Sequence, residues 1–365
     1  MSPMTVPPQT SESGSAIKSR ALRRGLVIPA CPLALDSARR LDERRQRAIL
    51  RYYSAAGAGG VATAVHTTQF GIRDPKVGLF EPLLALAAEE FDRLDETRKE
   101  PLYRIVGICG ETSQAAREAE VSVRLRYDAG MVSLAALSDA TDDELIAHCR
   151  RIAEVMPIFG FYLQPAVGGR VLPYGFWRRF CEIENVVGIK IAPFNRYHTL
   201  DVVRAVAESG RQDIALYTGN DDNIVLDLVT PFRFRVGNEI VERRIVGGLL
   251  GHWAVWTRQA VRILNQCHRA MESSGAENEA LLQLSVEVTD SNAAFFDAVN
   301  GFSGCIAGLH EVLRRQGLLE SIALLETEQG LSAGQSAEID RVYAAYPHLS
   351  DDAFVESHRD EWLRH

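Results

Sequence analysis

Lys190 is the residue whose position in this sequence most strongly suggests chemistry. It lies inside the apolar run 185–193, NVVGIKIAP, where an ammonium group is costly to bury. Burial lowers the pKa of an amine, so a fraction of the side chain becomes neutral near pH 7. A neutral amine can attack a carbonyl carbon and form a Schiff base, whose protonated form withdraws electrons from the adjacent carbon. The pattern predicts such a nucleophile; the alternative is a lysine that reaches solvent or pairs with an acid.

Three further residues carry groups that would serve this chemistry. Tyr162 lies in the preceding apolar run, near its end, so we expect its phenol beside the amine, where it could transfer protons. Thr67 and Thr68 end an earlier apolar run, and their hydroxyl and N–H groups could hold a carboxylate. Each also has a simpler interpretation, because aromatic residues are common in cores and threonine is common in strands.

These residues need a scaffold that brings the ends of several strands together. Apolar runs alternate with amphipathic helical segments from residue 25 to about residue 265, which indicates parallel strands covered by helices. The runs lie at 25–35, 59–68, 102–110, 130–137, 157–165, 185–193, 214–220 and 245–253. Eight such units predict an α/β fold, the (β/α)8 TIM barrel, which typically takes about 250 residues. A doubly wound open sheet is the alternative, although no GxGxxG motif follows the first run.

The chain divides into three parts. Residues 1–23 are rich in Pro, Ser and Thr, and we expect a flexible N-terminal tail. Residues 24–265 form the predicted barrel, and residues 266–365 a C-terminal helical extension packed on it. The segment 231–244 alternates around Gly237-Asn238 and predicts either a small hairpin or a long loop. If it directly precedes the last strand, we expect it at the amino-end face, with a role in assembly more than in catalysis.

Composition excludes several classes of protein. The chain is 46% hydrophobic and 24% charged, which is typical of globular proteins rather than disordered ones. A formal net charge of −8 argues against a nucleic-acid partner, and no apolar run is long enough to span a membrane. The six cysteines are scattered without a CxxC pair, so we expect buried thiols, no metal and a reducing, cytoplasmic location.

The motifs resemble those of the dihydrodipicolinate synthase / N-acetylneuraminate lyase family of Schiff-base aldolases. Four segments carry the resemblance: HTTQF at 66–70 in place of Gly-Thr-Thr-Gly-Glu, YLQP at 162–165, NVVGIK at 185–190 and GNDD at 219–222. The 28-residue spacing from Tyr162 to Lys190 also fits.

The resemblance implies a class I lyase, an aldolase or dehydratase, that acts on pyruvate or another 2-oxo acid without a cofactor. Lys190 would form the Schiff base, Tyr162 would shuttle protons, and Thr67 and Thr68 would hold the carboxylate. The remaining candidate substrate contacts are His66, Gln69, Gly219 and Asn220. The family also implies a homo-oligomer, either a tetramer or a dimer.

Two departures from the family bear on which reaction is catalysed. Dihydrodipicolinate synthases carry a tyrosine after strand 4, whereas residues 133–138 read SLAALS. They also carry an arginine after the Tyr-x-x-Pro element, and here that position is Val167, which cannot form a bidentate contact with a carboxylate. A true dihydrodipicolinate synthase is therefore not expected.

Two other hypotheses stay open. The missing tyrosine after strand 4 and the altered Thr-Thr signature suggest a catalytically silent barrel that binds a small ligand or partner. A separate possibility is a metal-dependent barrel lyase that uses Glu111, Asp221 or His252. His66 itself has two interpretations, a general base or substrate contact and a packed structural histidine.

Overall fold

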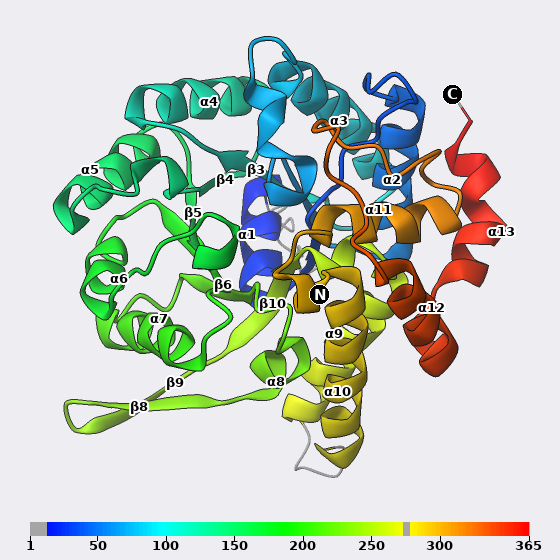
Figure 1. The fold of residues 1–365 in the computed structure, drawn as a ribbon. Helices are drawn as coiled ribbons and strands as arrows, with labels where there is room; N and C mark the ends of the chain where they lie inside the picture. The colour runs from blue at the N-terminus through cyan, green and yellow to red at the C-terminus, as the bar shows by residue number, and fades with distance from the viewer. Residues whose placement is uncertain (1–12, 273–277, 365) are drawn as a thin grey trace, which may run out of the picture.

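A computed structural model describes residues 13–272 and 278–364. Eight parallel strands form one sheet in the order β1-β10-β7-β6-β5-β4-β3-β2. A parallel bridge between Ala30 and Ala62, with the N–H of Cys31 donating to the Ala62 carbonyl, brings β1 beside β2 and closes the ring (Figure 1). The strands are β1 (Val27–Pro29), β2 (Gly60–Thr63), β3 (Tyr103–Ile108), β4 (Ala129–Val132), β5 (Ile158–Leu163), β6 (Val186–Ala192), β7 (Ala215–Thr218) and β10 (Ile245–Leu250).

Helices follow the strands and cover the outside of the ring, which confirms the predicted (β/α)8 barrel. They are α2 (Glu43–Ala56), α3 (Phe80–Asp95), α4 (Thr112–Arg124), α5 (Asp142–Ala153), α6 (Tyr174–Phe180), α7 (Arg196–Ser209), α8 (Ile224–Val229) and α9 (Thr257–Glu272). The boundary expected after residue 265 falls inside α9, which packs against α2 and α8 as the eighth barrel helix. Among the residues described, no helix is long and apolar enough to cross a membrane.

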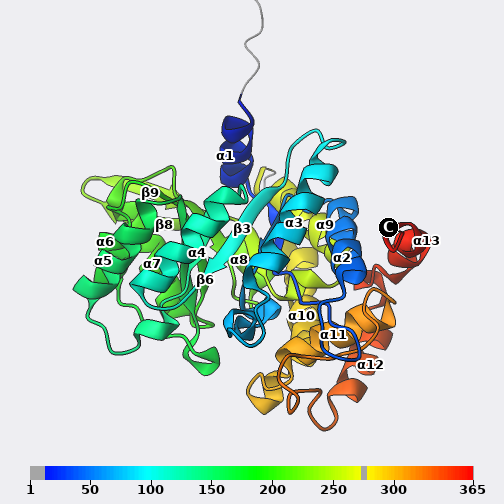
Figure 2. The same cartoon turned by 90° about the horizontal axis from the view of Figure 1, so that it is seen from above.

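The expectation of a flexible tail over residues 1–23 is wrong for its second half. Residues 14–24 form helix α1 (Gly14–Arg24), and residues 1–12 lie outside the described part of the chain. Leu22 is buried, and its carbonyl accepts a hydrogen bond from the Tyr217 hydroxyl at 2.8 Å. Lys18 forms an ion pair with Asp128. The physical reason is tertiary: α1 covers the amino end of the barrel interior and buries an apolar side that local composition does not reveal (Figure 2).

The C-terminal extension consists of α10 (Asn278–Phe295), α11 (Cys305–Arg315), α12 (Gln335–Ala345) and α13 (Asp352–Trp362). Helix α10 packs on α8, and α13 packs on α2, so the extension lies against one side of the barrel (Figure 1). The predicted hairpin is also present as β8 (Phe232–Val236) and β9 (Glu239–Arg243), beside α7. Arg243 donates to the carbonyl of Ile214, the residue before β7, so the hairpin lies toward the amino ends of the strands.

Alternate strand residues face two separate apolar layers. Side chains such as Ile28, Ile105 and Phe159 fill the barrel interior. Their neighbours Val27 and Val106 point outward to the helices. Because successive strand residues face opposite sides, the register of each strand decides which side chains reach the interior and its open end.

Candidate active site

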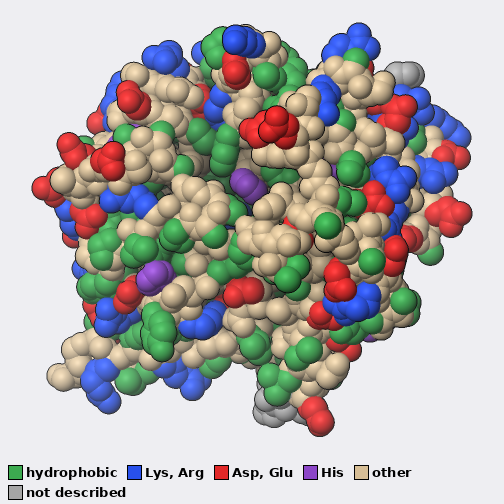
Figure 3. Space-filling model, viewed as in Figure 1, with side chains coloured by type: hydrophobic (Ala, Val, Ile, Leu, Met, Phe, Trp, Pro, Cys, Tyr) green, Lys and Arg blue, Asp and Glu red, His purple; other side chains and the backbone are tan. Residues whose placement is uncertain are grey.

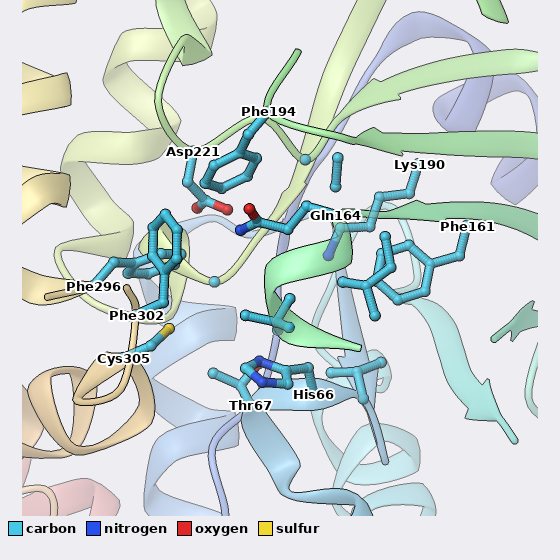
Figure 4. Close-up of a pocket in the computed structure, with 17 residues that line it drawn as sticks. His66, Thr67, Phe161, Gln164, Lys190, Phe194, Asp221, Phe296, Phe302 and Cys305 are labelled. Atoms are coloured by element: carbon cyan, nitrogen blue, oxygen red, sulfur yellow. The ribbon is translucent and has the colours of Figure 1, made fainter. Parts of the chain in front are cut away.

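A cavity opens at the carboxyl ends of the strands, where barrel active sites form. It contains about 550 Å³ of space free of protein atoms, counting its open mouth. Figure 4 shows side chains from several strand ends, among them those of β2, β5, β6 and β7, and from the C-terminal extension pointing into it. The lining residues are Ala30, Val65, His66, Thr67, Phe161, Leu163, Gln164, Val167, Lys190, Ala192, Phe194, Gly219, Asp221, Gly251, Phe296, Phe302 and Cys305.

Lys190 reaches this cavity from the middle of β6. Its side chain is 8% exposed, and its Nζ lies 4.7 Å from the centroid of the Phe161 ring. Burial lowers the pKa of Lys190 to about 8, against the opposing charge of Asp221. Within the described residues, the amine has neither a hydrogen bond nor an ion pair shorter than 4 Å. The alternative of a lysine paired with an acid or extended into solvent is therefore not supported.

Asp221 is the acidic residue whose charge most affects the pKa of that amine. It follows β7, is 4% exposed, and accepts a hydrogen bond from the His252 N–H at 2.9 Å. Burial raises the pKa of Asp221 to about 7, although the charge of Lys190 opposes this rise. A carboxyl group with such a pKa can both accept and donate a proton near neutrality. The sequence motif contained Asp221, but we expected it to act only in the metal-dependent alternative.

Tyr162 does not lie beside the amine, and that prediction is wrong. Its side chain is fully buried on the outer side of β5, between Trp177 and His198, with ring centroids 5.4 and 5.7 Å away. Its hydroxyl accepts a hydrogen bond from the Leu172 N–H at 3.1 Å.

The cause of this error is an irregularity in the strand register. Ile158 pairs with Val186, but Phe159 pairs with Gly188, so Val187 is an extra residue on β6. Without it, the spacing of 28 residues would place Tyr162 opposite Lys190. With it, Phe161 is opposite Lys190, and Tyr162 faces the helices.

The two threonines also have different positions. They belong to a short 3-10 turn, His66–Thr68, that follows β2. Thr67 lines the cavity, and within the described residues its hydroxyl has no partner. Thr68 points away, because its hydroxyl donates to the Cys31 carbonyl at 2.7 Å and accepts from the Val65 N–H. Thr68 therefore shapes the turn instead of facing a ligand.

His66 and Gln69, which flank the two threonines, also differ in whether they line the cavity. His66 lines the cavity, and burial together with the charge of Lys190 lowers its pKa to about 4. A neutral imidazole is available there for a hydrogen bond with a ligand. Gln69 does not line the cavity; its amide oxygen accepts the Leu325 N–H at 2.7 Å and ties the turn to the C-terminal segment.

Gly219 and Asn220 support the site instead of binding through their own side chains. A Cβ atom at Gly219 would lie 2.6 Å from Cε of Lys190, so only glycine leaves room for that side chain. The Asn220 amide oxygen accepts the Phe194 N–H at 3.0 Å, and its nitrogen donates to Asp227 at 2.9 Å. Asn220 thus connects the β6 and β7 loops that carry Phe194 and Asp221.

Several lining residues were not anticipated. Gln164 follows β5 directly and lines the cavity, and in the described part of the chain its side-chain amide has no hydrogen-bond partner. Its position at the end of a predicted strand could have identified it from the sequence. Phe296, Phe302 and Cys305 come from the extension, and nothing in their local sequence distinguishes them from core residues.

The metal-dependent alternative lacks a ligand set. No group of three His, Cys, Asp or Glu side chains that could hold a metal ion occurs within residues 13–272 and 278–364. The imidazole of His252 packs on Phe295, with ring centroids 5.6 Å apart, and does not line the cavity.

Comparison with known proteins agrees with the observed fold. No family model matches the chain. A curated 4-hydroxy-tetrahydrodipicolinate synthase of Alkaliphilus oremlandii is 32% identical over 120 residues, which is 32% of this chain and only 39% of that relative.

Solved structures match over most of the chain. Dihydrodipicolinate synthase from Thermotoga maritima has a TM-score of 0.71 at 17% identity, covering 90% of this chain and 99% of its own. N-acetylneuraminate lyase from Fusobacterium nucleatum has a TM-score of 0.68 at 13% identity, covering 89% and 99%. The TM-scores establish the fold, and at identities this low they establish the fold alone. The resemblance to the dihydrodipicolinate synthase / N-acetylneuraminate lyase family is thus confirmed, in fold over most of the chain and in sequence over about a third of it.

Proposed function

We propose that this protein is a lyase of the Schiff-base aldolase type, in which Lys190 attacks the carbonyl of pyruvate or another 2-oxo acid. The observation that carries the proposal is a buried amine that has no hydrogen bond or ion pair with any described residue and faces a cavity that also holds Asp221. The side chains of His66, Thr67 and Gln164, which also lack hydrogen-bond partners in the described part of the chain, surround the same space. Buried polar groups normally have hydrogen-bond partners, so this convergence favours a ligand that supplies them.

The environment of the amine supports reactivity at neutral pH. Burial lowers the pKa of the Lys190 amine, although the charge of Asp221 opposes this shift. A larger fraction of this lysine is therefore neutral and nucleophilic near pH 7 than of an exposed lysine.

The proposed steps use groups in the cavity. The 2-oxo acid carboxylate accepts a hydrogen bond from the Thr67 hydroxyl, and the amine replaces the carbonyl oxygen, which leaves as water. The Asp221 carboxylate then takes a proton from the carbon next to the iminium, which produces an enamine. Because Tyr162 faces the helices, Asp221 takes the place that the family resemblance assigned to the tyrosine.

We further propose that the reaction is not that of a true dihydrodipicolinate synthase. Val167 lines the cavity where the family places an arginine. The nearby Arg170 donates to the carbonyls of Leu137 and Ala140 and does not line the cavity.

Borohydride trapping tests the proposal. Reduction in the presence of pyruvate is expected to add one reduced pyruvate to Lys190, located by peptide mass spectrometry. Lys190→Ala should lose the adduct, whereas Lys76→Ala, which removes an exposed lysine, should retain it. Absence of the adduct together with retained binding of pyruvate would refute the proposal and favour a silent, ligand-binding barrel.

Two further expectations, one from the resemblance and one from the cysteine pattern, remain proposals. A homo-oligomer is expected, but one similar solved structure is described as a monomeric dihydrodipicolinate synthase variant, so this fold does not dictate assembly. Sedimentation equilibrium of the full chain would distinguish monomer, dimer and tetramer. The cytoplasmic location is the second expectation, and the state of the six cysteines, all free in this structure, is consistent with it.

A further inference from the structure

We infer that the second half of the substrate, beyond the 2-oxo acid, is an uncharged apolar group of the size of an aromatic ring, such as the ring of an aryl aldehyde. This inference rests on the proposed function and adds the substrate class. It follows from the side chains that face Lys190 across the cavity, which are mainly phenylalanine rings (Figure 4).

Two of these rings form one wall. Phe194 from the loop after β6 and Phe302 from the extension meet edge to face, with centroids 5.7 Å apart. Phe296 lies beside them, and Leu163 and Val167 add aliphatic surface. The rings pack against each other and, with these aliphatic side chains, present an apolar wall to the cavity. An apolar wall favours contact with an apolar group over a hydrated chain.

The backbone holds both rings in place at a cost. Phe194 has φ of +49° and Phe302 has φ of +71°, in the left-handed region that side chains larger than glycine disfavour. The Phe194 N–H donates to Asn220 at 3.0 Å, and the Phe302 N–H donates to the Asp297 carbonyl at 3.1 Å. Glycine would relieve the strain at either position but would remove the ring. The presence of phenylalanine at both strained positions therefore indicates that the rings themselves serve the cavity.

Charge argues against a polar second half. Among the described residues that line the cavity, Lys190 is the only lysine or arginine, and its amine is consumed by the Schiff base. A second carboxylate or a phosphate would thus lack a counter-charge and face Asp221. In the space-filling view, acidic side chains occur within this face of the molecule as well as at its edge (Figure 3).

The corresponding reaction balances without an oxidant or reductant. Pyruvate and Lys190 form the imine and release water, and a methyl proton passes to Asp221. The enamine carbon then forms a bond to the aldehyde carbon, whose oxygen takes up a proton. Water finally hydrolyses the imine, which releases a 4-aryl-4-hydroxy-2-oxo acid and frees the lysine; the reverse direction cleaves the same bond.

Competition between aldehydes tests the inference. The full-length protein is incubated with pyruvate and benzaldehyde, succinic semialdehyde or glyceraldehyde, and the addition products are measured by mass spectrometry. We expect kcat/KM for benzaldehyde to exceed that for the other two at least ~10-fold. Phe302→Arg should shift the ratio toward succinic semialdehyde by about 10-fold or more, and Phe302→Leu should lower the benzaldehyde preference in a smaller step.

Val299→Ala is the matched control, because Val299 lies in the same segment and is 86% exposed. It should keep the parental ratio. A parental preference for succinic semialdehyde or glyceraldehyde, with the pyruvate adduct still formed at Lys190, would overturn this inference and leave the proposed function intact. Absence of that adduct, with binding of pyruvate retained, would overturn both.

Discussion

The position of Tyr162 yields the sharpest prediction. The family resemblance implies that this phenol transfers protons, whereas the structure places it among Trp177 and His198, outside the cavity. We therefore expect Tyr162→Phe to lower the stability of the protein measurably but to leave the rate of proton transfer nearly unchanged.

The size of each effect follows from the contacts. The substitution keeps the ring packing but removes the acceptor of the buried Leu172 N–H. Loss of that bond, with the donor left unpaired, should lower the free energy of unfolding by about 1–3 kcal/mol. The rate of proton transfer should stay within about 2-fold of the parent, because the phenol does not reach the cavity. Removal of a true general acid–base residue would instead lower the rate roughly 10²–10⁴-fold.

The assay is exchange of the pyruvate methyl protons with deuterium oxide, followed by proton NMR, since enamine formation exchanges these protons without any second substrate. Urea denaturation of the same samples measures the stability change. Phe161→Leu is the comparison variant, because Phe161 is one residue earlier and its ring contacts Lys190. Phe161→Leu should alter exchange more than Tyr162→Phe does.

A fall in exchange of 100-fold or more in a folded Tyr162→Phe variant would refute this reasoning. It would mean that the phenol reaches the amine and that β5 and β6 pair in the uninterrupted register.

Three other predictions concern the neighbouring groups. Gly219→Ala should abolish adduct formation, because its Cβ would displace the Lys190 side chain; an unchanged yield in borohydride trapping would contradict this. Asp221→Asn should move the pH midpoint of trapping below about 8, since the carboxylate raises the pKa of Lys190, and should strongly reduce methyl exchange, both measured between pH 5 and 9. Burial raises the pKa of Asp351 from 3.8 to about 6, so its contribution to stability is present below pH 3.8 and is lost as pH rises through 6. That loss amounts to roughly 3 kcal/mol, and urea denaturation at several pH values should show a smaller decline for Asp351→Asn.

The sequence alone determined the features that depend on local patterns. Apolar runs and helical periodicity predicted the barrel because each strand must be buried on both sides. The lysine within such a run identified Lys190 because a buried charge is expensive wherever the strand packs. The strand-end positions of His66, Thr67 and Gly219 also led to the cavity, since parallel strands end at one face.

The tertiary structure decided what depends on register and on distant segments. Because β6 has one extra residue at Val187, Phe161 instead of Tyr162 lies on the inner face of β5. No local sequence pattern marks such an irregularity. Helix α1 forms because it covers the barrel end, and not because of its own propensity. Phe302 and Cys305 reach Lys190 from more than a hundred residues away, because the extension folds back over the strand ends. The identity of the nucleophile was therefore local information, whereas its partners and the shape of the substrate space depend on how the strands and the extension pack.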